Sequence, residues 1–371
     1  MTKILIYGGN GWIGGMMCVL LSKKNIVFVK SNVRVNDKKA VEEELYIENP
    51  THVMSFIGRT HGNHNGTNYT TIDFLEQKGR IRENVRDNLF SPLVLAILCS
   101  RRNIHFTYLG TGCIFTYDDE HPFGKVENGF TESSLPNFFG SSYSVVKGYT
   151  DRMINQINEN ALNLRIRMPI TSEKSGRNFI TKITTYKKIC SVSNSMTVLP
   201  ELLPFVLDMM KNNQKGTINL TNPGLISHNE ILEMFKEIVD PEFTYQNFSQ
   251  EEQRKILAAD RSNNYLDTTK LEFFYTEKNC TPKYDYGEGW GMGHYVYKKN
   301  ITKLSKKGYD MNKVLMVDDK PEHIDSYGNV IKIPPFYGDT NDTYLLKLKE
   351  YLKEIKDEPN YRKIEKRGWS N

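Results

Sequence analysis

Tyr143 and Lys147 lie four residues apart in the segment GSSYSVVKG, a spacing that places both side chains on one face of a helix. A lysine ammonium beside a tyrosine stabilises the phenolate and lowers the pKa of the phenol from about 10. Such a tyrosine can pass a proton to a carbonyl oxygen while a hydride moves at the carbonyl carbon. Because the same spacing is common on solvated helices, the pair indicates carbonyl reduction only in combination with a cofactor site.

A glycine-rich loop has the pattern of such a cofactor site. Residues 8–14 read GGNGWIG, a G-x-x-G-x-x-G pattern that follows the first apolar strand and opens a helix. Glycines allow the backbone to approach a pyrophosphate, and the helix N-terminus offers N–H donors and the positive end of a dipole. In this context the loop indicates a dinucleotide site rather than a tight turn without a ligand. The residues expected to form it are Gly8, Gly11, Trp12, Ile13 and Gly14.

The end of the second predicted strand discriminates between the two nicotinamide cofactors. An acid there binds the ribose hydroxyls of NAD, whereas an arginine favours the 2′-phosphate of NADP. The segment reads SNVR and ends at Arg34, and the first acid after it is Asp37. Arg34 therefore favours NADPH, with NADH as the alternative cofactor. The competing interpretation of Arg34 is an ordinary exposed arginine.

Cys113 follows another apolar run, TYLGTGCIFTY, which breaks at Gly110, Thr111 and Gly112. Most free cysteines are small buried apolar residues, and the cysteine alone favours that interpretation. Its place at the open end of a strand, next to a threonine, raises the question of a chemical role.

The elements that must position these residues alternate between strand and helix. Runs typical of strands are KILIYGG, NIVFVKS, THVMSFIG, IHFTYLG and ALNLRIRMP. Helical stretches separate them, at about residues 12–23, in DKKAVEEELYIEN, over RENVRDNLFSPLVLAILCSRR and at about residues 144–158. This rhythm predicts an α/β fold with a doubly wound, parallel Rossmann sheet and helices on both faces.

Composition is typical of a soluble globular protein. Of the 371 residues, 39% are hydrophobic and 25% are charged, and the net charge of +5 is spread along the chain. This weak basicity suits an anionic ligand and argues against nucleic acid as a partner. The five cysteines have no zinc or disulfide spacing, the N-terminus reads as a strand, and no apolar run is long enough for a bilayer. We therefore expect a cytoplasmic protein without a membrane partner.

The chain resembles the extended short-chain dehydrogenase/reductases, and among them the epimerase/reductases that complete nucleotide-L-rhamnose synthesis. The matching motifs are IYGGNGWIGG, GTGCIF, PNFFGSSYSVVKG, LRIRMPI, NFITKI, NSMTVLPELLP, TNPGLISHNEIL and RSNNYLDTTKL. They run in order from about residue 3 to about residue 272. The resemblance implies an NADP-binding epimerase/reductase domain over residues 1–272, with a smaller substrate lobe mainly at residues 165–272.

The resemblance also implies roles for individual residues. Thr111, Tyr143 and Lys147 match the reductase triad of the family, in which Tyr143 and Lys147 also contact the cofactor. Cys113 and Lys182 match its acid/base pair for epimerisation, whereas related reductases without that activity typically carry tyrosine at the place of Cys113. A thiol and a lysine are suitable partners, because the C3 and C5 protons of a 4-keto sugar are acidic.

Cationic and amide side chains should contact the diphosphate of a sugar nucleotide. The candidates are Arg261, Asn178 and Arg167. We considered His61, in GRTHGNHNG, and rejected it as a catalyst, because a loop histidine among asparagines and glycines is expected to be exposed to solvent.

The implied reaction is NADPH-dependent 3,5-epimerisation and 4-reduction of a nucleotide 4-keto-6-deoxyglucose, with UDP favoured over dTDP by resemblance only. A separate 4,6-dehydratase would supply the keto sugar. The sequence leaves the oligomeric state open, with a homodimer as one option. The alternatives are a reductase without epimerase activity, an enzyme similar to GDP-fucose synthase, and a non-catalytic NADP-binding regulatory subunit.

Residues from about 295 to 369 have a second resemblance, to the C-terminal half of haloacid-dehalogenase-type phosphatases related to those that act on the RNA polymerase tail. Lys298 or Lys299 and the pair Asp318 and Asp319 match its phosphoryl-binding lysine and magnesium-binding acids. The D-x-D-x-[TV] motif that carries the nucleophile of that family occurs nowhere in the chain, so no aspartyl-phosphate chemistry is expected. We interpret residues 295–371 as a partial α/β domain and residues 273–294 as a junction.

Overall fold

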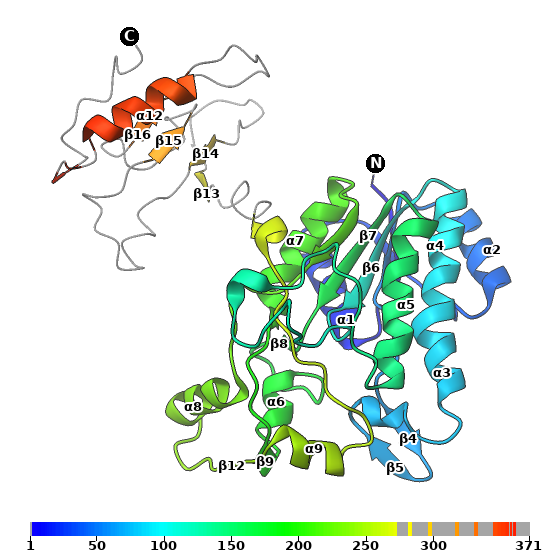
Figure 1. Cartoon of the computed structure of the whole chain (residues 1–371). Helices are drawn as coiled ribbons and strands as arrows, with labels where there is room; N and C mark the ends of the chain where they lie inside the picture. Colours follow the sequence, from blue (N-terminus) through cyan, green and yellow to red (C-terminus); the bar gives the residue numbers. More distant parts are fainter. Residues whose placement is uncertain are drawn as a thin grey trace. The chain divides into compact units, whose positions relative to one another are not determined.

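The computed structural model describes residues 2–272 without a gap, and beyond them residues 281–283, 296–298, 316–318, 330–332, 344–355, 357 and 359–360. The chain divides into two units, Met1–Glu272 and Phe273–Asn371, whose elements are labelled in Figure 1. Each unit is described by itself below.

Six parallel strands form the central sheet of the first unit, in the order β11-β7-β6-β3-β1-β2. They are β1 (Ile4–Tyr7), β2 (Phe28–Lys30), β3 (His52–Ser55), β6 (His105–Thr111), β7 (Ala161–Ile166) and β11 (Gly216–Asn219). All four residues of β1 and all six of β7 are buried, as expected for strands covered on both faces. The predicted doubly wound parallel sheet is confirmed.

The position of β1 determines where a ligand can bind. The chain leaves β1 toward β2 on one side and then returns to pair β3 on the other side. In doubly wound sheets the crevice outside the carboxyl ends of the strands at this switch point is the binding site. The residues that follow β1, β3 and β6 are therefore the ones to inspect.

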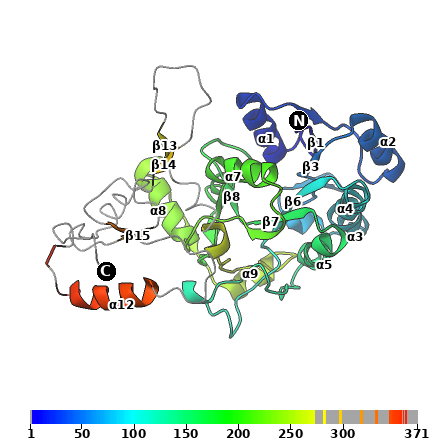
Figure 2. The ribbon, with the colours of Figure 1, turned by 90° about the horizontal axis from the view of Figure 1, so that it is seen from above.

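Helices cover the sheet in two groups. Figure 2 shows α1 and α7 on one face and α4 and α5 on the other, in agreement with the contacts of α1 with α7 and of α4 with α5. The helices around the sheet are α1 (Trp12–Lys23), α2 (Lys38–Glu48), α3 (Ile81–Val85), α4 (Ser91–Arg101), α5 (Ser142–Ile157) and α7 (Leu199–Lys211).

The long helix expected over residues 82–102 is interrupted. Between α3 and α4 the segment Arg86–Phe90 forms a π-helical turn. Pro92 lies in the first turn of α4 and has no N–H to donate to the carbonyl of Asn88, four residues earlier. That carbonyl instead accepts a 2.6 Å hydrogen bond from Thr150 Oγ1 of α5. The proline thus explains the irregularity, which also ties α5 to this segment.

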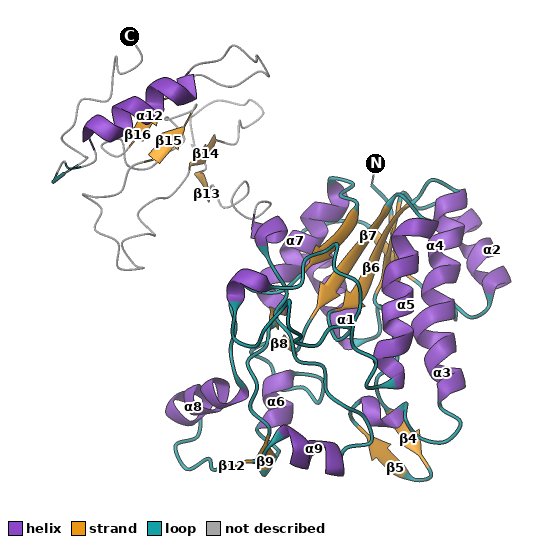
Figure 3. Ribbon diagram, viewed as in Figure 1, coloured by secondary structure: helices purple, strands orange, loops and turns teal. Residues whose placement is uncertain are grey.

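The remaining elements of the first unit are short and lie beyond the carboxyl ends of the strands (Figure 3). They are the hairpin β4 (Gly62–His64) and β5 (Thr67–Tyr69), the pair β8 (Pro169–Ile170) and β10 (Thr197–Val198), the pair β9 (Lys188–Ile189) and β12 (Gln246–Asn247), and the helices α6 (Phe179–Ile183), α8 (His228–Ile238) and α9 (Gln250–Ile256). A separate apolar cluster holds this lobe together, with Ile183, Ile189, Met196, Ile231 and Leu232 at its centre. Within the range expected to be mainly lobe, β11 and α7 belong instead to the sheet and its covering layer.

The described part of the second unit is also α/β. β13 (Thr281–Lys283) pairs antiparallel with β14 (Val296–Lys298), β15 (Met316–Asp318) pairs parallel with β16 (Val330–Lys332), and α12 spans Tyr344–Ile355. Asp318 ends β15, but its side chain, the side chain of Lys298, and all of Lys299 and Asp319 lie outside the described residues. Among the helices that the structure describes, none combines the length and the apolar character needed to cross a membrane.

Candidate active site

The glycine loop after β1 is shaped for close approach by a ligand. Gly8 has φ +78°, and a Cβ on it would lie 2.8 Å from the carbonyl carbon of Phe56, just past β3. A Cβ on Gly14 would lie 2.9 Å from the carbonyl carbon of Gly8 and closer still to its oxygen. Gly11 is the N-cap of α1 and makes no side-chain capping bond, so the first N–H groups of the helix are open to an anion. Trp12 and Ile13 form the first turn of α1, and the cradle therefore fits a dinucleotide pyrophosphate.

Arg34 lies beyond the end of β2 and is exposed. Within residues 2–272 no ion pair or side-chain hydrogen bond is formed by its guanidinium, which leaves it available to a phosphate. An acid also reaches the end of β2, because the carboxylate of Glu44 from α2 accepts a 2.7 Å hydrogen bond from Ser31 Oγ. An acid that reaches the strand end from the following helix was not visible in the sequence.

Thr111, Tyr143 and Cys113 come together where β6 ends and α5 begins. Thr111 is the last residue of β6, and its Oγ1 accepts a 3.1 Å hydrogen bond from the amide of Cys113. The Cys113 side chain is half-buried and packs in one apolar cluster with Tyr143, Phe74 and Leu75. Ser144 Oγ of α5 donates a 2.6 Å hydrogen bond to the Cys113 carbonyl, which fixes the loop to the helix.

Lys147 is buried one turn further along α5, with 4% of its surface exposed. Its Nζ donates to the hydroxyl of Tyr108 and lies 4.7 Å from the centre of that ring. Burial lowers the pKa of Lys147 to about 8, while the nearby Asp151 and Cys113 act in the opposite direction.

The expected effect of Lys147 on Tyr143 differs from the observed one. The sequence predicted a lowered pKa for the Tyr143 phenol, whereas burial raises the pKa of Tyr143 and the neighbouring Cys113 adds to the shift. The physical reason is that desolvation outweighs the hydrogen bonding with Thr111, and that the Lys147 ammonium is directed at Tyr108.

α5 itself is anchored by a buried ion pair. Arg165 of β7 makes a bidentate contact with Asp151 of α5, at 3.0 Å from Nε to Oδ1 and 2.7 Å from Nη2 to Oδ2. Both side chains are about 5% exposed or less. Because bidentate pairs fix orientation as well as distance, this contact holds the helix that carries Tyr143 and Lys147 in register with the sheet.

Lys182 lies on α6 in the lobe and is partly buried. Its Nζ donates a 3.2 Å hydrogen bond to the carbonyl of Thr70. Thr70 begins the turn whose residues Ile72, Phe74 and Leu75 pack with Cys113 and Tyr143, so the contact brings α6 to the edge of that cluster. Burial lowers the pKa of Lys182, and the cations Arg177 and Arg261 lower it further.

The three residues expected at the diphosphate differ in their environments. Arg261 is half-buried, pairs with Asp73 and donates a 2.8 Å hydrogen bond to the Ala259 carbonyl. Asn178 caps α6, and its side-chain Nδ2 donates hydrogen bonds to the carbonyls of Thr171 and Glu173. Arg167 departs most from the expectation.

Arg167 is only 1% exposed, and its guanidinium donates to Ser262, Asn194 and the Cys113 sulfur. It therefore lies in the interior of the protein and not at a surface open to a diphosphate.

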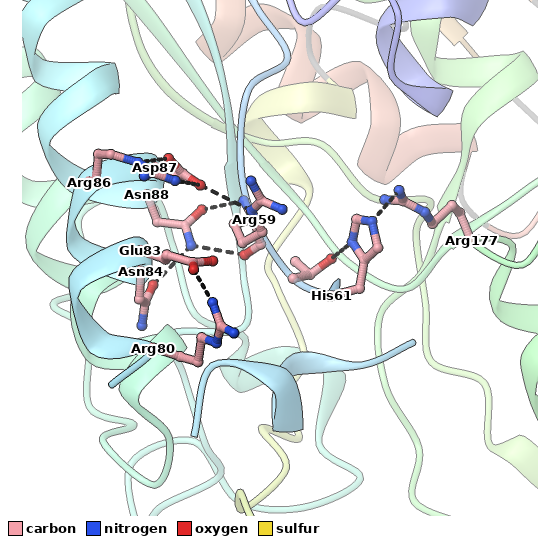
Figure 4. A network of polar contacts seen from close by, with 10 residues as sticks. Arg59, His61, Arg80, Glu83, Asn84, Arg86, Asp87, Asn88 and Arg177 are labelled. Atoms are coloured by element: carbon pink, nitrogen blue, oxygen red, sulfur yellow. Dashed lines mark hydrogen bonds and ion pairs between the residues drawn. The ribbon is translucent and has the colours of Figure 1, made fainter. Parts of the chain in front are cut away.

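A group of cations that the sequence reasoning missed lies after β3, on the ligand-binding edge of the sheet. Figure 4 shows the ring of His61 facing the guanidinium of Arg177, with 2.6 Å between Nε2 and Nη2. Arg59 lies nearby, paired with Asp87, and its amide donates a 2.9 Å bond to Asn88 Oδ1. The signal available in the sequence was Arg59, because an arginine that follows the third predicted strand lies at the ligand-binding edge of the sheet.

His61 is half-buried and not the freely exposed residue that was expected. Burial, together with the cations Arg177, Arg59 and Lys182, lowers its pKa to about 4. In the part of the chain that the structure describes, Arg177 and Lys182 form no ion pair with a carboxylate. Arg177 and Lys182 therefore leave this region with a positive charge, which suits an anionic substrate.

A cavity of about 890 Å³ lies at the other edge of the sheet, lined by residues that include His52 and His105 at the amino ends of β3 and β6. None of the site residues described above lines it. The candidate catalytic side chains meet instead at the carboxyl edge of the sheet.

Comparison with known proteins identifies two families along the chain. A protein of Acanthamoeba polyphaga mimivirus is 53% identical over 275 residues, which are 74% of this chain and 93% of that protein. A bifunctional dTDP-4-dehydrorhamnose 3,5-epimerase/dTDP-4-dehydrorhamnose reductase of Arabidopsis thaliana is 42% identical over 276 residues, 74% of this chain and 88% of that enzyme.

The solved structure of the UDP-rhamnose synthase from Acanthamoeba polyphaga mimivirus is similar to the first unit, with 52% identity and a TM-score of 0.70 over 74% of this chain and 93% of that chain. The family model of NLI interacting factor-like phosphatases matches residues 247–362, a range that begins inside the first unit. Both resemblances noted in the sequence are confirmed.

Proposed function

Because the chain belongs to the family of nucleotide-rhamnose epimerase/reductases, we propose that it converts a nucleotide 4-keto-6-deoxyglucose to the nucleotide L-rhamnose by 3,5-epimerisation and NADPH-dependent 4-reduction. The observation that carries the proposal is the meeting of Thr111, Cys113 and Tyr143 at the junction of β6 and α5. UDP is favoured as the nucleotide by the similarity to the viral UDP-rhamnose synthase.

Epimerisation needs a base on one face of the sugar and an acid on the other, and Cys113 and Lys182 are the two groups proposed for it. The base takes the C3 or C5 proton, and the C–H electron pair moves into an enolate whose charge lies on O4. The acid then returns a proton to the same carbon from the opposite face. Thr111 Oγ1 accepts from the Cys113 amide and is hydrogen-bonded with the Tyr143 phenol, so both hydroxyls lie at one place where O4 would bind.

Reduction of C4 uses Tyr143 as the proton donor to O4. Its raised pKa keeps the phenol protonated at neutral pH, which is the form that a donor requires. Lys147, charged below a pKa of about 8 and bonded to the Tyr108 hydroxyl, lies one turn from Tyr143 on α5 and is the cation proposed to support Tyr143 as it gives up the proton. NADPH bound at the glycine loop supplies the hydride for C4.

The proposal also covers the choice of cofactor, the supply of the keto sugar and the second unit. NADPH is preferred over NADH because Arg34 is exposed and unpaired at the end of β2. A separate 4,6-dehydratase would supply the keto sugar to the protein in the cytoplasm. We assign no phosphatase activity to the second unit, because the chain lacks the D-x-D-x-[TV] motif.

The test is turnover of UDP-4-keto-6-deoxyglucose with NADPH in deuterated water, with the product identified by NMR. Wild type should yield UDP-L-rhamnose with deuterium at C3 and C5. Cys113→Ala should lose that deuterium, whereas Tyr143→Phe should keep the exchange and lose the reduction. Cys190→Ala, which removes a buried thiol elsewhere in the lobe, serves as the matched control.

Two outcomes would contradict the proposal in different ways. Reduction without inversion in wild type would identify a reductase without epimerase activity. Binding of NADPH with no turnover would identify a regulatory NADP-binding protein.

A further inference from the structure

Arg167 follows β7 and lies entirely inside the first unit. Its Nη1 donates to Ser262 Oγ at 3.0 Å and to Cys113 Sγ at 3.3 Å. Its Nη2 donates to the carbonyl of Ser262 at 2.6 Å and to the Asn194 side chain. Its Nε is buried without a partner. Every hydrogen-bond partner found for the guanidinium, apart from the thiol, is thus a neutral group.

A buried guanidinium needs an anion. Arginine stays protonated in proteins, and an unpaired charge in the interior is strongly destabilising. Among the described residues no carboxylate pairs with Arg167, and the groups whose charges act on it are Cys113 and Tyr117. The question is which of these two becomes negative.

Tyr117 does not fit the role. Its hydroxyl donates a 2.9 Å hydrogen bond to the Ser193 carbonyl, a bond that requires the phenol to keep its proton. Burial raises the pKa of Tyr117 to about 12, so the phenol stays neutral over the working range of an enzyme. Cys113 is the group that remains.

We propose that Arg167 is the positioning residue of Cys113: its Nη1 orients the sulfur, and its charge stabilises the thiolate. This assigns the direction of epimerisation within the proposed function. The Cys113 thiolate takes the proton from carbon and becomes a thiol, the electron pair enters the enolate, and the Lys182 ammonium returns a proton to the opposite face.

Other titratable groups also face the thiol. Tyr143 and Lys147 of α5 both interact with Cys113. Tyr143 is neutral at working pH, and Lys147 directs its ammonium at Tyr108. Arg167 is therefore the cation in hydrogen-bond contact with the sulfur. Substitution of Arg167 should change the reactivity of Cys113 more than substitution of Tyr143 or Lys147.

The first experiment uses the wild-type chain alone. Iodoacetamide labelling of each cysteine is followed by mass spectrometry between pH 5 and pH 10, since only the thiolate reacts. Cys18, a half-buried thiol whose pKa is raised by burial, is the internal reference. At pH 7 Cys113 should be labelled faster than Cys18, because its sulfur accepts a hydrogen bond from a guanidinium. Equal or slower labelling of Cys113 would overturn the proposal.

The second experiment compares variants of the guanidinium. Arg167→Gln should slow the labelling of Cys113 at pH 7 roughly tenfold, and Arg167→Lys should restore most of the rate. Ser262→Ala removes one hydrogen bond from the same guanidinium but leaves the charge, so Cys113 in that variant should be labelled at the wild-type rate. A folded Arg167→Gln with an unchanged labelling rate would refute the assignment. If Arg167→Gln does not fold, the proposal is tested by Arg167→Lys and by the labelling of Cys113 relative to Cys18 in the wild type.

Deuterium exchange at C3 and C5 of the keto sugar distinguishes this inference from the function on which it rests. Labelling needs no substrate, so slower labelling of Cys113 in Arg167→Gln without any exchange in wild type would support the contact of Arg167 with Cys113 and reject the epimerase. Exchange in wild type that is unaffected in Arg167→Gln would keep the epimerase and reject the role of Arg167.

Discussion

Burial of single side chains sets the protonation states that the reaction requires. Tyr143 and Lys147 share α5, yet desolvation shifts their pKa values in opposite directions, up for the phenol and down for the ammonium. Tyr108 holds the ammonium in place from β6. The core of the sheet thus sets the pKa values of Tyr143 and Lys147, and both values depend on the packing of β6 against α5.

The lowered pKa of Lys147 predicts an alkaline limb in the reductase reaction. Lys147 is charged below pH 8 and neutral above it, so kcat/KM for reduction should fall as pH rises through about 8. Lys147→Arg stays charged and should extend the plateau toward higher pH, whatever its absolute rate. The measurement is kcat/KM for the epimerised keto sugar from pH 6 to pH 10. A wild-type profile that stays flat to pH 10 would rule out this account of Lys147.

In the strand–turn–helix element β1–α1, the close approach of backbone segments requires glycine at two positions. Gly14 sits against the carbonyl of Gly8, and Gly8 against the backbone after β3. These contacts bring the loop, the helix N-terminus and the third strand within reach of one pyrophosphate. No side chain is needed to bind it, because the N–H groups of α1 supply the donors.

Gly14→Ala should weaken NADPH binding about tenfold or more, because the new Cβ displaces the Gly8 carbonyl from the cradle. Gly15→Ala is the matched control: it lies on the same helix turn, and its Cβ would meet no atom closer than 3.7 Å. Fluorescence titration of NADPH against both variants gives the two dissociation constants. Equal constants would show that the loop does not form the cofactor site.

The first unit as a whole carries several half-buried or buried histidines that are neutral in the native state. Burial lowers the pKa of His52 and His105, and it lowers the pKa of His61 and His228 to about 4. In each case the unfolded chain binds the proton at a higher pH than the folded chain does, since a free histidine titrates near 6.5. Acid therefore lowers the free energy of unfolding of the native state.

The stability of the unit should be complete above about pH 6.5 and should fall as the pH drops from there to about 4. A loss of roughly 1–2 kcal/mol by pH 5 is expected from His228 after allowance for solvent screening. Urea unfolding at pH 7.5 and pH 5.0 measures it, with His228→Asn as the variant that should show a smaller difference. A urea midpoint that rises on acidification would contradict this assignment of neutral histidines.

Much of the fold was determined by local pattern. The strands that became β1, β3, β6 and β7, and the helix Trp12–Lys23, were predicted because apolar runs alternate with helical periodicity. The glycine loop was predictable for the same reason, since its chemistry resides in the backbone. The long helix around residues 82–102 was predicted, but its π-helical turn was not, because the group that bonds the carbonyl freed by Pro92 comes from another helix.

The sequence also supplied the residue types proposed for the chemistry, at Thr111, Cys113, Tyr143, Lys147 and Lys182. The tertiary structure decided which charges act on them. Arg167 is 54 residues from Cys113 and Ser262 is 95 residues from Arg167, and only the packing of the lobe on the sheet brings them together. Desolvation, which sets the pKa of Tyr143 and Lys147, depends on what covers a side chain in three dimensions, and a linear pattern does not contain that information.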